Sequence, residues 1–352
     1  MKMKRRYPVC WLLPLRSNAI IFLVVLIMLA VPWGTAAAQE NDELSIVLAV
    51  EFNAHAACAH VARNKGWYKA EGIHLKSYDS YVTGMALAAG LLRGDVDAAY
   101  ICLIPAINVY VNGNVPLKVV AGTHKYGYAI VVNPSVIKIP QDLQRPGIRI
   151  GCSREGSPTD AILHKAIETY VLDKQTVTAN IQRMNPPKQL MALKTGQLDA
   201  AVVPEQYPSM AENLGFKVLL RAQDLWSDMQ GSVLVVTDDL IQNHPDIVEK
   251  LVKVTRFSTD WINQHPKEAS EIIASQLNNT GTTIFPEKAA KLNSQFTVTP
   301  EVMETSLIKG LKYSTDIWPS DVDETIAYMV NLGYIKNTFD SSRILDLRWL
   351  SQ

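Results

Sequence analysis

The chain has 352 residues, of which 48% are apolar and 19% charged, and its 34 basic residues balance its 34 acidic ones. This composition excludes a disordered chain and is typical of one large or two medium globular domains.

The first 38 residues have the pattern of a secretory signal. An apolar run from Ala19 to Val31 precedes an Ala-Ala-Ala sequence that ends at Ala38, where we expect cleavage after secretion. A membrane anchor is the alternative, but thirteen apolar residues fall short of the roughly 20 that span a bilayer. Cleavage removes five basic and no acidic residues and leaves 29 against 34. We therefore expect no nucleic acid partner. The five basic residues are Lys2, Lys4, Arg5, Arg6 and Arg16.

Strands and helices then alternate from residue 44 onward. "LSIVLAV" from Leu44 predicts a buried strand, a small-residue helix ends at Gly66, and a second strand follows. "YVTGMALAAGLLRGDVDAAYICLIPA" adds a helix and a strand, and "VPLKVVAGTH" another strand. This order predicts an α/β lobe with a mostly parallel sheet.

The series restarts after Lys125 with "YGYAIVVN", the strand "IRIGCS" and a helix from Ser157. We expect a second lobe over 127–230, and a first lobe formed by 44–126 together with 231–352. Two strands, near 122–125 and 229–232, would join the lobes and permit hinge closure. From Asn243 the chain is mainly amphipathic helix, which we expect to pack on the first lobe. Its breaks are at Pro266, Pro286 and Pro319.

One phrase occurs twice, as "LLRGDVDAAY" from Leu91 and as "LKTGQLDAAV" from Leu193. In each copy a basic residue suits the negative end of a helix, and Gly94 or Gly196 can adopt the left-handed conformation that ends it. Each copy predicts a helix, a stop and a strand. Two copies favour two similar α/β units over a repeat array.

The sequence offers no motif for catalysis or for a metal. Cys58, Cys102 and Cys152 are too few and too scattered for a disulfide framework or a zinc site, and they allow at most one bridge. We expect Cys58 to pack in the core. The seven histidines lack metal-ligand spacing, and G-x-S-x-G, H-E-x-x-H and a Walker lysine are missing. We therefore predict no enzyme, cofactor or metal.

Four motifs in order carry a family resemblance: "ARNKGWYKAEGIHLK", "GMALAAGLLRGDVDAAY", "GIRIGCSREGSPTDAILHKA" and "LKTGQLDAAVVPEQY". They resemble the extracytoplasmic substrate-binding proteins of bacterial ABC importers, in the branch for nitrate, alkanesulfonate, taurine and thiamine-pyrimidine precursors. The resemblance implies an α/β type II periplasmic-binding-protein fold with a ligand cleft between two lobes. It also implies a monomer that delivers a small molecule to an ABC permease and its ATPase.

The segment "EGSPTD" is the first candidate for a ligand contact. Ser157 is typical of an N-cap with Pro158 after it, which leaves first-turn N–H groups free to hold an oxoanion. The resemblance assigns ligand contacts to Gly156 and Ser157, and Thr159 lies in the same turn. The alternative is a capping box between Ser157 and Asp160 that serves only the helix. An acid at Asp160 also argues against a bare anion as cargo.

Four further candidates lie between residues 53 and 84, in the expected first lobe. Thr83 can cap the helix that Gly84 begins, with no acid in its first turn, although capping alone explains Thr83. Asn53 and His55 follow the first strand, where the carboxyl ends of strands face ligands, although a lone His is more often a surface or packing residue.

The remaining candidates are Cys102, His124, Glu205 and Gln206. Cys102 lies in "YICLIPA" and the acid–amide pair in "VVPEQYP", the segments that follow the two repeated phrases, while His124 lies at the crossover between lobes. The Glu205 carboxylate could receive an amine, although a solvated loop end is an equal interpretation. With Asp160, it favours a cargo that bears nitrogen.

We therefore expect a solute-binding component of an ABC importer for a sulfonate-, nitrate- or pyrimidine-type solute. A periplasmic sensor with the same fold is the first alternative. A pyrimidine-forming enzyme is the second, although the cysteine-rich motif of that relative is missing here.

Overall fold

The computed structural model describes residues 44–284 and 297–350. The expected signal peptide, its cleavage site at Ala38 and Pro286 lie outside these residues. Within the described part of the chain, no helix is both long and apolar enough to cross a membrane.

The first of two sheets has six strands in the order β11-β4-β10-β3-β1-β2. Strand β1 pairs in parallel with β2 and β3, and β10 runs antiparallel between β3 and β4. The strand-helix-strand order predicted the parallel part, and β10 contains the strand that was expected near 229–232 and returns from far along the chain. The strands are β1 (Ser45–Glu51), β2 (His74–Tyr81), β3 (Ala98–Cys102), β4 (Leu117–Tyr126), β10 (Gln230–Thr237) and β11 (Leu311–Tyr313).

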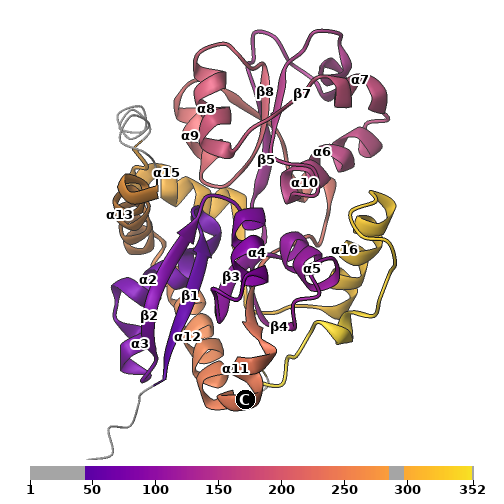
Figure 1. The fold of residues 1–352 in the computed structure, drawn as a ribbon. Coiled ribbons are helices and arrows are strands. Elements are labelled where there is room, and N and C mark those ends of the chain that lie inside the picture. Colours follow the sequence, from indigo (N-terminus) through magenta and orange to yellow (C-terminus); the bar gives the residue numbers. More distant parts are fainter. Residues whose placement is uncertain (1–43, 285–296, 351–352) are drawn as a thin grey trace, which may run out of the picture. The chain divides into compact units, whose positions relative to one another are not determined.

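The second sheet has five strands in the order β7-β6-β8-β5-β9 and uses one continuous stretch of chain (Figure 1). Strand β6 pairs in parallel with β7 and β8, and β5 runs antiparallel between β8 and β9. The strands are β5 (Tyr128–Val132), β6 (Ile150–Cys152), β7 (Ile181–Arg183), β8 (Ala200–Pro204) and β9 (Lys217–Arg221).

Helices cover both sheets, and the long C-terminal ones contact helices of the first sheet's half. Helices α12 (Pro245–Gln264) and α13 (Pro266–Ile284) pack against α2 (Ala57–Asn64), and α16 (Pro319–Asn331) packs against α5 (Leu103–Val111). The remaining described helices are α3 (Trp67–Ala70), α4 (Gly84–Leu92), α6 (Pro158–Thr169), α7 (Lys174–Ala179), α8 (Pro186–Lys194), α9 (Tyr207–Asn213), α10 (Ala222–Leu225), α11 (Asp238–Asn243) and α15 (Pro300–Thr305), with the short turns η1 (Ala54–Ala56), η2 (Pro140–Gln144), η4 (Ser306–Gly310) and η5 (Ser341–Arg343).

The expectation of a mainly helical C-terminal part was incomplete, because strand β11 joins the edge of the first sheet. Its three residues pair antiparallel with the end of β4, from Leu311 opposite Tyr126 to Tyr313 opposite His124. A three-residue strand is too short to show a periodic pattern, and its partner lies far away in the sequence.

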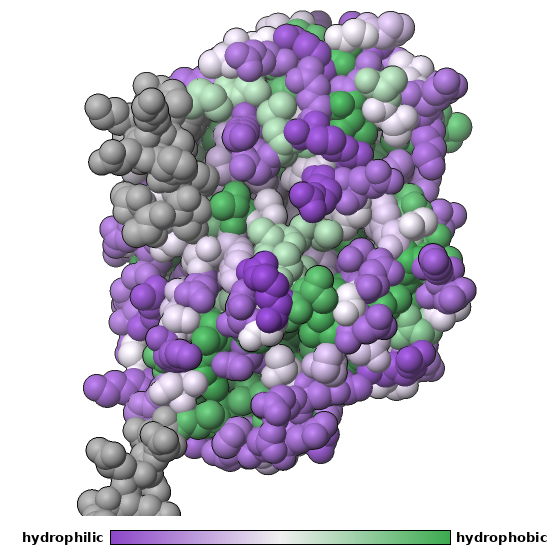
Figure 2. Space-filling model, in the orientation of Figure 1, coloured by the Kyte–Doolittle hydropathy of each residue, from purple (hydrophilic) through white to green (hydrophobic). Residues whose placement is uncertain are grey.

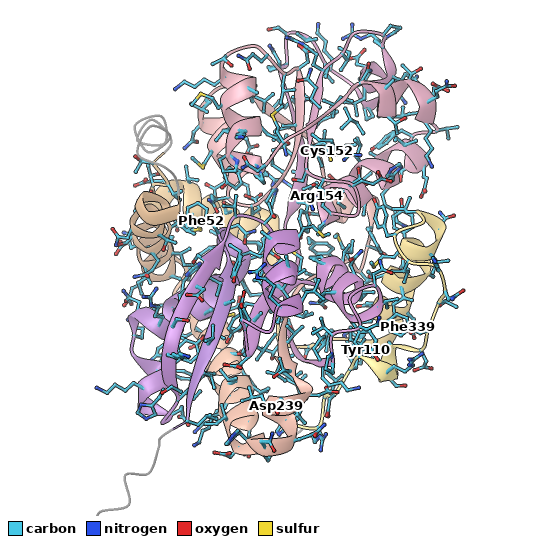
Figure 3. All side chains as sticks on the ribbon, in the orientation of Figure 1. Phe52, Tyr110, Cys152, Arg154, Asp239 and Phe339 are labelled. Atoms are coloured by element: carbon cyan, nitrogen blue, oxygen red, sulfur yellow. The ribbon has the colours of Figure 1, made fainter. Side chains whose placement is uncertain are left out.

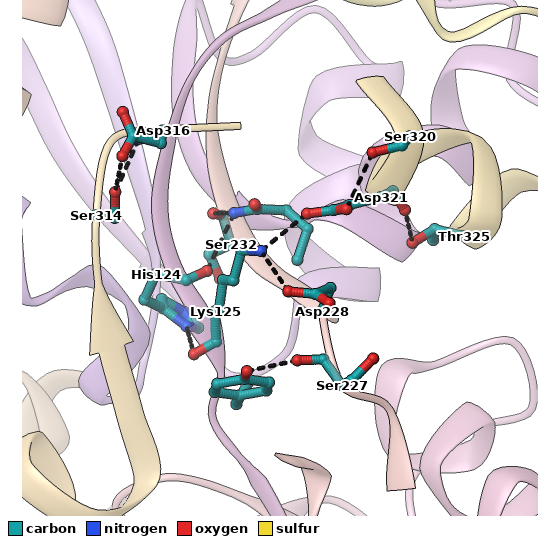
Figure 4. A network of polar contacts seen from close by, with 12 residues as sticks. His124, Lys125, Ser227, Asp228, Ser232, Ser314, Asp316, Ser320, Asp321 and Thr325 are labelled. Atoms are coloured by element: carbon teal, nitrogen blue, oxygen red, sulfur yellow. Dashed lines mark hydrogen bonds and ion pairs between the residues drawn. The ribbon is translucent and has the colours of Figure 1, made fainter. Parts of the chain in front are cut away.

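A buried lysine ties together the two segments that connect the sheets. Lys125, on β4, donates hydrogen bonds to Asp228, which precedes β10, and to Asp321 on α16, at 3.0 and 2.9 Å (Figure 4). Burial alone would lower the pKa of Lys125, but these two carboxylates outweigh it and raise the pKa. Beside it, the Tyr126 hydroxyl donates to the Ser227 carbonyl at 2.5 Å.

The repeated phrase forms the predicted helix ends, at Gly94 with φ 74° and Gly196 with φ 70°. The aspartate that follows in each copy, Asp97 or Asp199, makes the same pair of hydrogen bonds. Asp97 accepts the Val47 N–H through its carboxylate at 2.7 Å and donates its own N–H to the Val47 carbonyl at 3.0 Å. Asp199 makes the same pair of bonds with Arg149, both at 2.9 Å. Each aspartate therefore acts as a clamp: its two hydrogen bonds hold the start of its own strand, β3 or β8, against the neighbouring parallel strand.

The three cysteines of the described chain are free and buried, which leaves no disulfide among them. Cys58 is fully buried and belongs to the hydrophobic core, as predicted.

We predict that Asp199→Asn lowers the free energy of unfolding by about 1.5–3 kcal/mol at neutral pH, because charge-assisted hydrogen bonds are lost. The bonds from Arg149 lower the pKa of Asp199. A depressed pKa stabilises the folded state above the unfolded pKa, and this contribution disappears as the pH falls through the folded value. The difference between wild type and variant in urea unfolding should therefore shrink on acidification.

Asp95→Asn is the matched control in the first copy of the phrase. Its carboxylate is half exposed and, within the described residues, pairs with the similarly exposed Arg93 alone, so the loss should stay below about 1 kcal/mol. Equal losses in the two variants would contradict the proposed clamp.

Candidate functional site

A cavity of about 490 Å³ is lined by residues of both sheets' halves. Its walls include Glu51, Asn53 and Cys102 at the carboxyl ends of β1 and β3, and Tyr128 and Pro204 at the facing ends of β5 and β8. Ligands in open α/β sheets bind at such ends. Figure 3 shows Cys152 and Arg154 at the end of the second sheet that faces the first. Figure 2 shows paler and apolar residues near the middle of the face in view, among hydrophilic ones.

Two helices begin at the cavity with the caps that the sequence predicted. The Thr83 hydroxyl accepts the Ala86 N–H at 3.2 Å, and Ser157 accepts the Asp160 N–H at 3.3 Å with Pro158 as the first helical residue. Thr83, Gly84, Ser157 and Thr159 all line the cavity. Gly84 allows a close approach, since a Cβ there would lie 2.5 Å from the Glu51 Oε1.

Asp160 is not a wall of the cavity. Its side chain is fully buried, and it accepts hydrogen bonds from the Arg183 Nη1 at 2.5 Å and from the Tyr334 hydroxyl. Its Oδ2 also accepts the N–H of Gly156, a buried glycine that does not line the cavity. In a full capping box the Asp160 carboxylate would accept the Ser157 N–H instead. The predicted box is therefore incomplete: the Ser157 side chain accepts the Asp160 N–H, but the reciprocal bond is not made.

Glu205 and Gln206 also lie away from the cavity, contrary to the expectation that Glu205 faces a ligand. Both are buried, and the Glu205 carboxylate accepts hydrogen bonds from Arg221 at 2.9 Å and Ser209 at 3.0 Å. Burial raises the pKa of Glu205, while Arg221 opposes the rise. Arg221 ends strand β9, two strands away from β8 in the sheet, and this neighbour could not be foreseen from "VVPEQYP" alone.

The two candidate histidines contact the backbone at the junction of β4 and β5 and do not line the cavity. His55 is within hydrogen-bond distance of the Gly127 carbonyl, 2.8 Å from its Nε2, and the His124 Nδ1 lies 3.2 Å from the Lys125 carbonyl. The two rings are 4.5 Å apart. Burial lowers the pKa of His55 to about 4 and lowers that of His124 as well, so both rings are neutral at neutral pH.

Sequence reasoning missed the acid at the floor of the cavity. Glu51 accepts the Cys102 N–H at 2.7 Å through Oε1 and the Asn53 amide at 3.1 Å through Oε2. Burial raises its pKa. Burial and the Glu51 charge also raise the pKa of Cys102, whose sulfur lies 2.5 Å from the Tyr128 hydroxyl. The position of Glu51 could have indicated it, because Glu51 directly follows the apolar run of the first strand.

The second sheet's half contributes two arginines that were not predicted. Arg183 lines the cavity with a partly exposed side chain while Nη1 bonds Asp160 and the Ser153 carbonyl. Arg154 is exposed and lines the cavity, and its guanidinium group makes no hydrogen bond or ion pair within the described chain. The cavity therefore combines two positive side chains and two helix N-termini with one carboxyl group.

The fold matches solved structures of binding proteins. The periplasmic nitrate-binding protein NrtA of Synechocystis PCC 6803 has a TM-score of 0.71 at 14% identity and covers 88% of each chain. The alkanesulfonate-binding protein SsuA of Xanthomonas axonopodis pv. citri, bound to MOPS, has 0.69 at 12%, covering 86% of this chain and 98% of its own. The ligand-binding component of an ABC-type import system from Staphylococcus aureus, with zinc bound, has 0.69 at 18%, covering 88% and 98%. These structures confirm the predicted type II periplasmic-binding-protein fold.

The sequence itself matches two kinds of relatives. A curated protein, the nitrate import ATP-binding protein NrtC of Synechocystis sp. (strain ATCC 27184 / PCC 6803 / Kazusa), is 22% identical over 235 residues. The match covers 61% of this chain and spans about a third, 34%, of the length of that relative. The model of the NMT1-like family matches residues 39–278. Because this match covers most of the chain, the protein belongs to the NMT1-like family.

Proposed function

We propose that this protein is the solute-binding component of an ABC importer and holds a small polar organic solute in the cavity. The observation that carries the proposal is the cavity itself, whose walls come from both sheets and converge on two helix N-termini. The nitrate- and sulfonate-binding proteins of the same fold support this role. The partners would be a permease and its ATPase, with a monomer acting in the periplasm after cleavage at Ala38.

The charges favour an organic anion as the solute. Arg154 and Arg183 line the cavity, and the helix ends at Thr83 and Ser157 offer N–H groups to the same cavity. A sulfonate or similar group would bind there, and the remainder of the solute would reach the Glu51 and Asn53 side chains. The nitrogen-bearing cargo favoured by Asp160 and Glu205 loses its basis, because protein partners occupy both carboxylates.

Closure of two lobes around the solute is the proposed motion, with 44–126 plus 231–352 as one lobe and 127–230 as the other. Bonds already cross this boundary: Tyr334 donates to Asp160, and Lys165 on α6 lies 3.8 Å from Glu324 on α16. Opening would break such bonds, while the strands around Lys125 stay connected.

Solute binding is tested by thermal unfolding with aliphatic sulfonates, nitrate and an aminopyrimidine. A sulfonate at about 100 times its Kd should stabilise the protein by about 2.7 kcal/mol. Arg154→Gln should weaken this binding about tenfold or more, because a charge-assisted hydrogen bond is lost. The measurement is titration calorimetry on both proteins.

Arg145→Gln is the control, since Arg145 is also exposed but lies outside the cavity and bonds the Val136 carbonyl. If no solute in the panel shifts the unfolding temperature, the binding function loses its support. If only the aminopyrimidine shifts it, the function stands and the anion assignment is wrong.

The Tyr334 bond gives a separate prediction. Tyr334→Phe should lower the free energy of unfolding by about 1–3 kcal/mol, because the buried Asp160 loses a hydrogen-bond donor. Urea unfolding measures it. Tyr110→Phe is the control, whose hydroxyl bonds the Arg343 carbonyl at an exposed position and should cost less than about 0.5 kcal/mol. A Tyr334 variant as stable as the control would show that the Asp160 bond adds nothing to stability.

A further inference from the structure

Three different metal-ligating groups lie close together, and two of them, on Glu51 and Cys102, belong to residues that line the cavity. A Glu51 carboxylate oxygen, a His55 ring nitrogen and the Cys102 sulfur all lie within 4.8 Å of one another, and all three residues are buried. They come from the end of β1, the turn η1 after it and the end of β3. Carboxylate, imidazole and thiolate together are a donor set that suits zinc-class ions better than magnesium or calcium.

The tautomer of His55 leaves the lone pair of Nδ1 available to a metal ion. Its Nε2 lies 2.8 Å from the Gly127 carbonyl, which can only accept, so Nε2 carries the hydrogen. The lone pair is then on Nδ1, which lies 3.5 Å from the Cys102 sulfur. A ring N–H donated to a backbone carbonyl is the usual orienting contact of a metal-bound histidine.

The spacing of these two atoms fits a tetrahedral ion. Zinc bonds of about 2.3 Å to sulfur and about 2.0–2.1 Å to nitrogen place the two ligands about 3.5–3.6 Å apart at a tetrahedral angle. The distance of 3.5 Å between the Cys102 Sγ and the His55 Nδ1 matches this value.

Hydrogen bonds hold the Glu51 carboxylate in place and still leave its oxygens able to bind a metal ion. Each of its oxygens accepts one hydrogen bond, from the Cys102 N–H and the Asn53 amide, and each keeps a further lone pair. Around the sulfur, the Tyr128 hydroxyl at 2.5 Å and the Ser232 hydroxyl at 3.4 Å can donate to a thiolate. A divalent cation would balance the thiolate and the carboxylate together.

We propose that Glu51, His55 and Cys102 hold one zinc-class divalent ion, with a fourth position open to the cavity. Glu51 and Cys102 are themselves cavity walls, so water or a donor atom of a bound solute can take that position. The proposal does not rest on the solute-binding function.

The direct test is metal titration of protein purified from cells that express the full chain, after dialysis against a chelator. We expect one equivalent of Co²⁺ to bind with a thiolate-to-cobalt charge-transfer absorption, and Zn²⁺ to displace it. Cys102→Ser should abolish this absorption. Glu51→Gln preserves the shape of the side chain and should weaken binding about tenfold or more.

Cys152→Ser is the matched control, because Cys152 is an equally buried free thiol that lies outside the cluster. It should bind cobalt as the wild type does. Failure of the wild type to bind either ion, or an absorption that persists in Cys102→Ser, overturns the proposal. If circular dichroism shows Cys102→Ser unfolded, the wild-type spectrum and the Glu51→Gln affinity decide. Thermal shifts by solutes on the chelator-treated protein test the binding function separately.

Discussion

The carboxylates of Asp97 and Asp199 fix the relation between strands in both halves of the protein. Each closes a two-point contact with the residue opposite, Val47 or Arg149, by accepting its N–H through the side chain and donating to its carbonyl through the backbone. The carbonyls of the two aspartates then receive the N–H groups of Thr237 and Asn133 on the antiparallel side. One residue type thus sets the register of three neighbouring strands twice.

The site follows from this constraint. With the register fixed at one end of β3 and β8, the opposite ends of the strands face the cavity with Cys102 and Pro204. The two helix starts at Thr83 and Ser157 are brought to the same cavity. The duplicated phrase therefore lines no part of the cavity, yet it positions the residues that do.

Local patterns in the sequence predicted what depends on near neighbours. The caps at Thr83 and Ser157 and the left-handed glycines were visible, because each rests on contacts within a few residues. The roles of Asp160 and Glu205 were not, since their partners Tyr334 and Arg221 come from distant segments. A carboxylate near a cleft looks the same in sequence whether it faces a ligand or another side chain.

The two sheets differ in how much of the chain each requires. All strands of the second sheet lie between Tyr128 and Arg221. The first sheet is complete only when β10 and β11 have been added, and β11 ends at Tyr313. A chain that emerges from its N-terminus can complete the later sheet first. The earlier strands β1 and β3 meanwhile have each other and β2, but β3 lacks its antiparallel neighbour. The half that begins the chain is thus the last to complete its sheet, and its open strand edge is the part that needs protection during synthesis.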